Sequence, residues 1–141
     1  MQTALKIVAG IPKPGGSKRG FLHKATGRVI ITEDCKRSKD WRAVVAGTAA
    51  EHCKTPFTGP VVVTVTFHMA RPKSHFRSGR NSGFLRDGAP KYPTVKPDCT
   101  KLWRSTEDAL KGIAWLDDAQ VVSQLVAKAY SERPGAVISI G

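Results

Sequence analysis

The sequence predicts a single small α/β (α+β) domain in which two main helices pack on a mixed β-sheet. The β-branched run PVVVTVTFHMA at 60–70 indicates a buried central strand. Apolar residues recur at helical spacing over 39–53 and 99–111, which indicates two amphipathic helices. The composition of the 141 residues does not shift along the chain, so we expect one domain spanning 1–141.

Short strands and turns complete the predicted fold. Strands are expected between turn-forming residues, over 4–9, 21–24, 28–32, 121–130 and 136–140. Residues 21–32 indicate a hairpin, with Ala25, Thr26 and Gly27 in its turn. Residues 11–20 (IPKPGGSKRG) are expected to form a Pro/Gly-rich loop, and a further turn is expected at 132–135.

Each predicted helix has recognisable ends and faces. In the first helix, Ser38 stands where an N-cap is favoured, and Trp41 falls on the apolar face that should enter the core. The second helix ends at Gly112, a residue typical of C-caps. Its polar face is a strip of acidic, basic and hydroxyl side chains: Thr100, Lys101, Arg104, Glu107, Asp108 and Lys111.

The most unusual property of the composition is its charge. Lys and Arg number 23 against 11 Asp and Glu, which gives a formal net charge of +12. Such a balance favours a polyanionic partner, and nucleic acid is the simplest one. A cationic chain that binds acidic proteins, or that is merely soluble, is the alternative. Membrane binding is less favoured, because no basic amphipathic helix stands out.

Several classes of protein are disfavoured. No apolar run reaches the roughly 18 residues of a transmembrane helix and the N-terminus lacks a signal-peptide pattern, so we expect a soluble, cytoplasmic protein. Cys35, Cys53 and Cys99 suit neither a disulfide framework nor a zinc site, and the four histidines lack zinc-ligand spacing. Gly16-Ser17 stands where a P-loop requires Lys-Ser/Thr, which argues against nucleotide binding.

Two loops carry cations that could contact DNA. Residues 71–97 show neither helical nor strand periodicity, and their cations are Arg71, Lys73, Arg77, Arg80, Arg86, Lys91 and Lys96. Phe76, Phe84 and Tyr92 lie between these cations and could stack on bases. The N-terminal loop adds Lys13, Lys18 and Arg19. The alternatives are a flexible basic loop pinned by its aromatic residues, and a plain surface turn.

Acidic residues are scarce, yet five of them fall within 98–118: Asp98, Glu107, Asp108, Asp117 and Asp118. Phosphodiester hydrolysis needs a Lewis acid, and Mg²⁺ takes carboxylate oxygens as ligands. Acids gathered on a DNA-binding protein would repel the substrate unless a cation lay between them. The cluster therefore indicates a Mg²⁺ site, which Mn²⁺ could also fill. The alternative is that these acids cap loops or pair with Lys101, Arg104 and Lys111.

Three motifs in this region occur in a fixed order: Lys96-Pro97-Asp98, then Glu107-Asp108-Ala109-Leu110, then Asp117-Asp118-Ala119-Gln120. Together they resemble the RusA family of Holliday junction resolvases, whose pattern is an Asp-x-Asp, a helix with Asp-Ala-Leu, and an Asp-Asp-x-Gln turn. The match is close over 96–122. It is looser at the N-terminal loop, at Trp41 and at the strand that leads to Arg71.

The resemblance implies a homodimeric nuclease that binds four-way (Holliday) junctions in DNA and resolves them by paired nicks, with Mg²⁺ held on aspartates. By matching position, Asp98, Asp117 and Asp118 would be catalytic metal ligands. Arg104 stands where the family commonly has a catalytic Lys. Both cations can stabilise a scissile phosphate, although Arg is the better phosphate clamp and the poorer proton donor.

One position departs from the family pattern. Thr100 stands at the second acid of Asp-x-Asp, so one expected ligand is absent. Glu107 lies about two turns later on the same helix face, and we expect it to substitute. Asp98 and Asp118 would then be the principal ligands, with Asp117 and Glu107 secondary. Thr100 would lie just outside the ligand set, where Asp108 would either support it or pair with a neighbouring cation.

Two other functions fit the same residues. Loss of the metal through the change at Thr100 would leave a protein that binds branched DNA without cutting it. A nuclease for flaps or replication forks would carry the same acids and cations. Cleavage of a panel of branched DNAs separates these alternatives from junction resolution.

Overall fold

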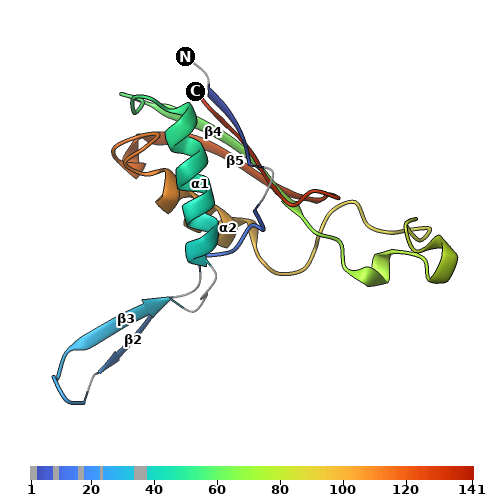
Figure 1. The fold of residues 1–141 in the computed structure, drawn as a ribbon. Coiled ribbons are helices and arrows are strands. Elements are labelled where there is room, and N and C mark those ends of the chain that lie inside the picture. Colours follow the sequence, from blue (N-terminus) through green and yellow to red (C-terminus); the bar gives the residue numbers. More distant parts are fainter. Residues whose placement is uncertain (1–2, 8–9, 16–17, 23, 34–37) are drawn as a thin grey trace.

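The computed structural model describes residues 3–7, 10–15, 18–22, 24–33 and 38–141. Its body is a four-stranded sheet in the order β1-β6-β4-β5 (Figure 1). The strands are β1 (Thr3–Ile7), β4 (Val61–Met69), β5 (Val121–Tyr130) and β6 (Gly135–Ile140). β4 runs parallel to β5 and antiparallel to β6, which is itself antiparallel to β1. The predicted mixed sheet is therefore confirmed, and β4 is a central strand.

Both predicted helices are present and lie on one face of this sheet (Figure 1). Helix α1 spans Ser38–His52 and helix α2 spans Cys99–Leu110. The apolar face of α2 is buried as its periodicity predicts, and Gly112 follows the helix with a φ of +83°, a conformation that favours glycine. The predicted α+β domain with two main helices is confirmed.

Only one face of β4 is buried, which corrects the prediction of a wholly buried strand. Val61, Val63, Val65 and Phe67 face the helices and are buried, whereas Val62 on the other face is 48% exposed. The reason is that both helices cover the same side. The other side of the sheet has no covering layer among the described residues, so alternate side chains remain in solvent.

The predicted hairpin is present but longer than expected. β2 (Lys18–Leu22) pairs antiparallel with β3 (Val29–Glu33), and Gly27 in the connecting turn has a φ of +67°. Lys18 and Arg19 thus lie in a strand and not in the loop predicted at 11–20, because backbone pairing continues to Lys18 opposite Glu33. The ribbon projects from the body (Figure 1). Residues 16–17, which the same loop prediction included, lie outside the described residues.

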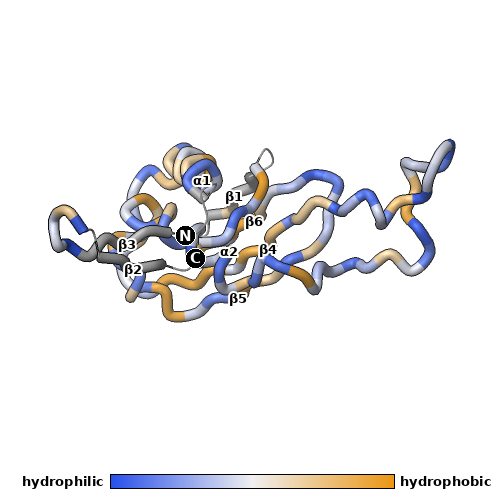
Figure 2. The backbone as a smooth tube through the Cα atoms, turned by 90° about the horizontal axis from the view of Figure 1, so that it is seen from below, coloured by the Kyte–Doolittle hydropathy of each residue, from blue (hydrophilic) through white to orange (hydrophobic). Residues whose placement is uncertain are grey.

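Residues 71–97 form a second projection, which we call the arm (Figures 1 and 2). The absence of regular periodicity was correctly predicted, but the arm is not structureless. It contains the 3-10 turns η1 (Lys73–His75) and η2 (Gly79–Asn81), and an antiparallel bridge joins Phe76 to Leu85. The arm therefore folds back on itself as an irregular hairpin.

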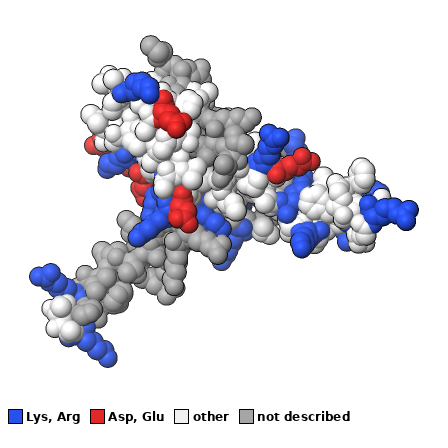
Figure 3. Space-filling view, in the orientation of Figure 1, with Lys and Arg blue, Asp and Glu red and all other residues white. Residues whose placement is uncertain are grey.

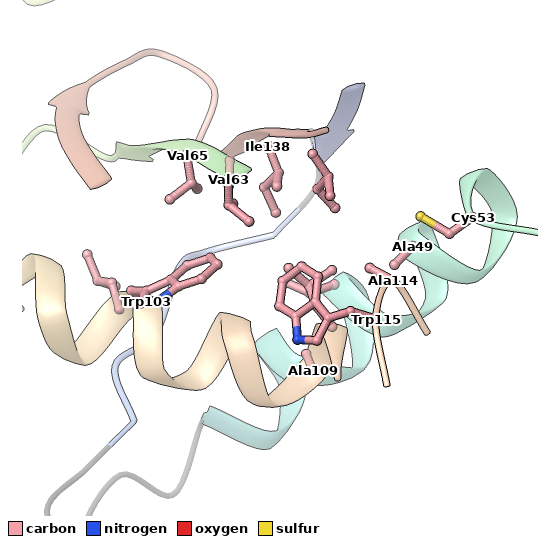
Figure 4. Close-up of a cluster of buried hydrophobic side chains, with 14 of the residues drawn as sticks. Ala49, Cys53, Val63, Val65, Trp103, Ala109, Ala114, Trp115 and Ile138 are labelled. Atoms are coloured by element: carbon pink, nitrogen blue, oxygen red, sulfur yellow. The ribbon is translucent and has the colours of Figure 1, made fainter. Parts of the chain in front are cut away.

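The core ties α2 to both α1 and the sheet. Trp41 of α1 is buried, as predicted, and its Nε1 donates a hydrogen bond of 3.0 Å to Thr106 Oγ1 of α2. Trp103 of α2 and Trp115, which follows the helix, pack against each other with ring centroids 6.5 Å apart, near Val63 and Ile138 of the sheet (Figure 4). These contacts fix the rotation of α2 about its axis.

Replacing Thr106 with Val should destabilise the protein by about 1–3 kcal/mol, because it leaves the buried Trp41 Nε1 without an acceptor. Urea denaturation measures the change in the free energy of unfolding. Thr48→Val is the matched control, since both threonines donate to a carbonyl four residues earlier but Thr48 is not bonded to a tryptophan. Equal losses in the two variants would contradict this role for Trp41.

Candidate metal and DNA site on helix α2

The polar strip of α2 faces away from the core, as predicted. Thr100, Arg104 and Asp108 are exposed, while Lys101 and Glu107 are half-buried. The sequence did not predict the role of Ser105, which is fully buried and donates a 2.6 Å hydrogen bond to the carbonyl of Lys13. This hydrogen bond joins the N-terminal loop to the side of α2 that borders the polar strip.

The structure places two of the predicted ligands, Glu107 and Asp118, near enough to interact electrostatically. Burial raises the pKa of Glu107, and the nearby carboxylate of Asp118 raises it further. Asp118 comes from the 3-10 turn η3 (Asp118–Gln120), and its Oδ1 accepts a 2.9 Å hydrogen bond from Trp115 Nε1. Two acids that repel each other in a half-buried position fit a cation between them.

Trp103 contributes a polar atom to the same place. Its buried Nε1 lies near enough to Glu107 to lower the pKa of that carboxyl, opposing the effect of burial, yet it has no partner in hydrogen-bonding geometry. A small shift of the Glu107 side chain would satisfy it. The Trp103 donor thus opposes the rise in the pKa of Glu107 but does not overcome the larger effects of burial and Asp118.

The side chain of Asp117 stabilises the local turn. Its carboxylate accepts a 2.9 Å hydrogen bond from the backbone N–H of Ala119, and the Gln120 side chain accepts one from the N–H of Asp117, so the two residues form a capping box. Gln120 also donates to the carbonyls of Phe57 and Gly59. This network holds the turn on which Asp118 stands.

Asp98 lies at the other end of α2. It is the N-cap residue, but its exposed carboxylate makes no capping hydrogen bond. The segment before it is fixed by Lys128, whose Nζ donates to the carbonyls of Val95 and Pro97 at 2.8 and 2.9 Å. Asp98 is thus held on a well-anchored backbone with an unengaged carboxylate.

The predicted ligands do not converge on one point. Asp98 and Glu107 are nine positions apart, a rise of about 13 Å along the helix. In the part of the chain that the structure describes, no group of three His, Cys, Asp or Glu side chains could hold one ion. Mg²⁺ commonly uses only one or two carboxylates and completes its shell with water and phosphate oxygens. Two carboxylates, such as those of Glu107 and Asp118, are therefore enough for Mg²⁺ where water and phosphate oxygens supply the remaining ligands.

The alternative that these acids cap loops or pair with neighbouring cations holds in part for the described residues: Asp117 caps the turn η3, but the ion pairs with Lys101, Arg104 and Lys111 are not formed. Lys101, Arg104 and Lys111 form no ion pair with Asp108 or Glu107, although Lys111 is close enough to lower the pKa of Glu107. An ion pair does form on the arm, between Arg77 and Asp87 at 3.1 Å. The negative charge beside α2 is left without a paired cation.

The N-terminal loop places a predicted DNA-binding lysine beside α2. The N–H of Gly15 donates a 2.7 Å hydrogen bond to the carbonyl of Lys101. A Cβ at Gly15 would lie 3.3 Å from the backbone of Ser105 and 3.4 Å from the side chain of Arg104, so the loop crosses the helix closely. Lys13 and Arg104 therefore lie near each other, although 91 positions separate them in the sequence.

Cations occupy both projections and the region between them (Figure 3). The predicted cations Arg71, Lys73, Arg77, Arg80, Arg86 and Lys96 all belong to the arm. Lys24 and Arg28, which were not predicted as DNA contacts, are exposed at the hairpin tip. Their position on either side of the predicted turn was the signal that could have found them. Nothing is described for the side chains of Lys18 and Arg19.

The arrangement defines a class: a small basic α+β protein with two acids outside any ion pair, one on helix α2 and one on the turn η3, suits an enzyme that processes nucleic acid. Residues 12–141 match the family described as Endodeoxyribonuclease RusA. An uncharacterized protein, YqaN of Bacillus subtilis (strain 168), is 34% identical over 134 residues, which cover 94% of this chain and 92% of that protein. The chain belongs to the RusA family of endodeoxyribonucleases. Membership supports nuclease activity on DNA.

Helices in the described part of the chain are all too short or too polar to cross a membrane. The described cysteines, Cys53 and Cys99, are both free thiols. Burial raises the pKa of the Cys53 thiol. His23 and Cys35 lie outside the described residues.

Adding Mg²⁺ should raise the Tm of the protein, by several degrees at about 100 times its Kd, because the cation binds only the folded site. Asp118→Asn and Glu107→Gln should each remove most of this increase. In EDTA neither variant should lower the Tm. In Asp118→Asn the asparagine oxygen can still accept the hydrogen bond from Trp115 Nε1. In Glu107→Gln the change removes a carboxylate whose charged form is disfavoured by burial and by Asp118.

Differential scanning calorimetry measures both conditions. Asp87→Asn is the control, since Asp87 pairs with Arg77 on the arm and its loss should leave the Mg²⁺ effect unchanged. The pair would not be a metal site if all three variants kept the full increase in Tm.

Proposed function

We propose that the protein is a Mg²⁺-dependent, structure-specific endonuclease that resolves four-way DNA junctions by paired nicks. The observation that carries the proposal is the pair formed by Glu107 and Asp118, two acids without paired cations in a family of DNA endonucleases. On a chain of net charge +12, such a pair is useful when a metal ion lies between it and the phosphate.

Glu107 and Asp118 would hold Mg²⁺ against the scissile phosphate. When bound there, the cation would lower the pKa of an attacking water and stabilise charge on the phosphate oxygens. Arg104, exposed on the same helix, would bind the non-bridging phosphate oxygens. Asp117 would position Asp118 through its turn. Asp98 would contact a second cation or an ordered water at the start of α2, near Thr100, while Asp108 would lie beside Glu107.

Glu107 would replace the acid that the family pattern places at Thr100. The support is that Glu107 lies beside Asp118, whereas Thr100 lies about 10 Å earlier along the helix. The site would accordingly have moved towards the C-terminal half of α2. An acid at Glu107 in place of one at Thr100 would keep the same number of carboxylates and shift the metal site along the helix.

The cations of the arm, Lys13 in the N-terminal loop, and Lys24 and Arg28 at the hairpin tip would hold the DNA arms. The arm and the hairpin are separate projections that extend from the body on different sides, and Lys13 lies against α2 between them (Figures 1 and 3). A single straight duplex follows one line, whereas a branched DNA leaves its centre in several directions. Widely separated basic projections therefore favour a branched substrate.

We also propose that two copies associate through the open face of the sheet. Residues paired across strands point to the same side, so Ser139, Thr64 and Leu125 form one row there, and Val137, Thr66 and Ala127 form the next. These rows on β4, β5 and β6 hold no charged residue, and Lys6 of β1 pairs with Val137 at the edge of the second row. Leu125 is 66% exposed. Two molecules of equal positive charge repel least through such a face, and a two-fold dimer would place two sites for paired nicks.

Asp118→Asn and Glu107→Gln should each abolish nicking of a synthetic four-way junction in Mg²⁺ while binding stays intact, because the amides bind Mg²⁺ poorly and remove repulsion against phosphate. Asp98→Asn should behave in the same way. Gel assays with each strand labelled in turn measure nicking and binding.

Thr100→Asp should be tolerated, and combined with Glu107→Gln it should restore part of the activity if Glu107 occupies the vacated role. Glu51→Gln on α1 is a matched exposed control. Normal nicking by Glu107→Gln across a Mg²⁺ titration would remove Glu107 from the site. Preferred cutting of flaps or forks over four-way junctions would replace junction resolution as the function.

Leu125→Glu should convert a dimer to a monomer, because it places like charges opposite each other at the centre of a two-fold interface. Sedimentation velocity measures the change. Val44→Glu on α1 is the control, since it adds the same charge at an exposed apolar residue on the helix side of the sheet. A wild-type monomer at micromolar concentration, or a Leu125→Glu dimer, would contradict the interface.

A further inference from the structure

Phe84, near the end of the arm, is a large apolar side chain that folding leaves in solvent. It is 66% exposed. Its backbone is nevertheless fixed on both sides, because its N–H donates to the carbonyl of Asn81 and its carbonyl accepts from the N–H of Arg77, both at 2.9 Å. The ring is therefore displayed on an ordered turn and is not part of a loose loop.

The rest of the arm supports this display. Phe76 and Leu85 form a backbone bridge, and Arg86 Nε donates a 2.7 Å hydrogen bond to the carbonyl of Phe76. At the base, the Arg71 guanidinium lies over the ring of Tyr130 at 5.0 Å and donates to the carbonyl of Pro90 at 2.7 Å. These contacts anchor the arm to β5 and hold its outgoing and returning halves together.

The other two aromatic residues of the arm are less available. Phe76 is half-buried within the bridge. Tyr92 is exposed, but its ring already contacts the Lys91 ammonium, which lies 5.4 Å from the ring centroid. No ring or cation contact occupies the face of Phe84 among the described residues. Of the three residues that the sequence indicated for stacking, Phe84 is the one presented for a new partner.

The surroundings of Phe84 favour DNA as that partner. Arg80 lies in the adjacent turn η2 and has no acidic partner in the described chain. Asp87 is the acid of the arm, and its charge is matched by Arg77. A free aromatic ring among unmatched cations is complementary to a base bordered by phosphates, because the ring stacks while the cations bind the backbone.

We propose that Phe84 stacks on a base exposed at the branch point of the DNA and so contributes to the choice of branched over duplex DNA. Insertion into a duplex requires bases to be unstacked first, which costs a few kcal/mol per step. At a branch point stacking is already interrupted, so the ring gains the contact without that cost. The proposal rests on the proposed function, since it assigns the part of the substrate that the arm recognises.

The test uses full-length protein in EDTA, where no cutting occurs, and a four-way junction with 2-aminopurine at the branch point. Wild type should change the 2-aminopurine fluorescence at the branch but not at a position within a duplex arm. Phe84→Ala should lose this change and lower the affinity ratio of junction to duplex by about fivefold or more. Phe84→Trp should keep both.

Two controls separate stacking from other effects. Arg80→Ala should weaken binding to junction and duplex by the same factor and leave the branch-point signal, because a phosphate contact carries no branch information. Ile11→Ala removes an exposed apolar side chain outside the arm and should change neither quantity. Circular dichroism confirms that the variants fold.

The outcomes are distinct. A wild-type protein with no preference for junctions would overturn the proposed function. A wild-type protein that prefers junctions, with Phe84→Ala equal to it in signal and affinity ratio, would overturn the stacking role alone. Unchanged DNA binding together with an altered monomer–dimer equilibrium in Phe84→Ala would assign the ring to a contact between copies, which also excludes the proposal.

Discussion

The position of helix α2 is the constraint on which the candidate site depends. Its apolar face packs between α1 and the sheet, and the buried bond from Trp41 to Thr106 fixes its rotation. Because the helix repeats every 3.6 residues, fixing one face also fixes the other. Arg104 and Glu107 are thereby directed away from the core. Ser105, on the side of the helix that contacts the N-terminal loop, brings Lys13 to the same strip.

The charge beside α2 differs in sign from the charge on most of the molecule. Most of the molecule is positive, and the projections carry cations with few acids to match them. Beside α2 the sign is reversed, because Glu107 and Asp118 lie together without an ion pair and the pKa of Glu107 is raised. Folding places like charges together here, which opposes stability. Such strain is commonly found at functional sites, where a bound cation relieves it.

Much of the fold could be predicted because it depends on periodicity. The β-branched run in Val61–Met69 and the helical spacing in Cys99–Leu110 are local patterns that packing then reinforces. The exposed face of β4 could not be predicted, since Val62 differs from Val63 only in which side the helices cover. The arm could not be predicted either, because its 3-10 turns and the bridge from Phe76 to Leu85 depend on contacts between distant residues.

The candidate site was predicted in composition and only partly in geometry. Scarcity of acids identified Asp98, Glu107, Asp117 and Asp118 as a group, and the motifs placed them in the RusA family, which the comparison confirmed. The sequence ranked Asp118 above Asp117 as a ligand but gave no physical reason for the difference. The structure engages the first in a capping box and sets the second beside Glu107. The hydrogen bonds of the capping box depend on the geometry of the local turn, which amino-acid composition does not reveal.

The central claim is that a divalent cation binds between Glu107 and Asp118. Iron-mediated cleavage of the protein measures this most directly: Fe²⁺ replaces Mg²⁺, ascorbate and peroxide generate radicals at the bound iron, and mass spectrometry locates the cut peptide bonds. The account predicts cuts near Glu107 and near Asp118, both suppressed by excess Mg²⁺ and both absent in Asp118→Asn. Mg²⁺-sensitive cuts confined to other segments, with none near these two residues, would contradict it.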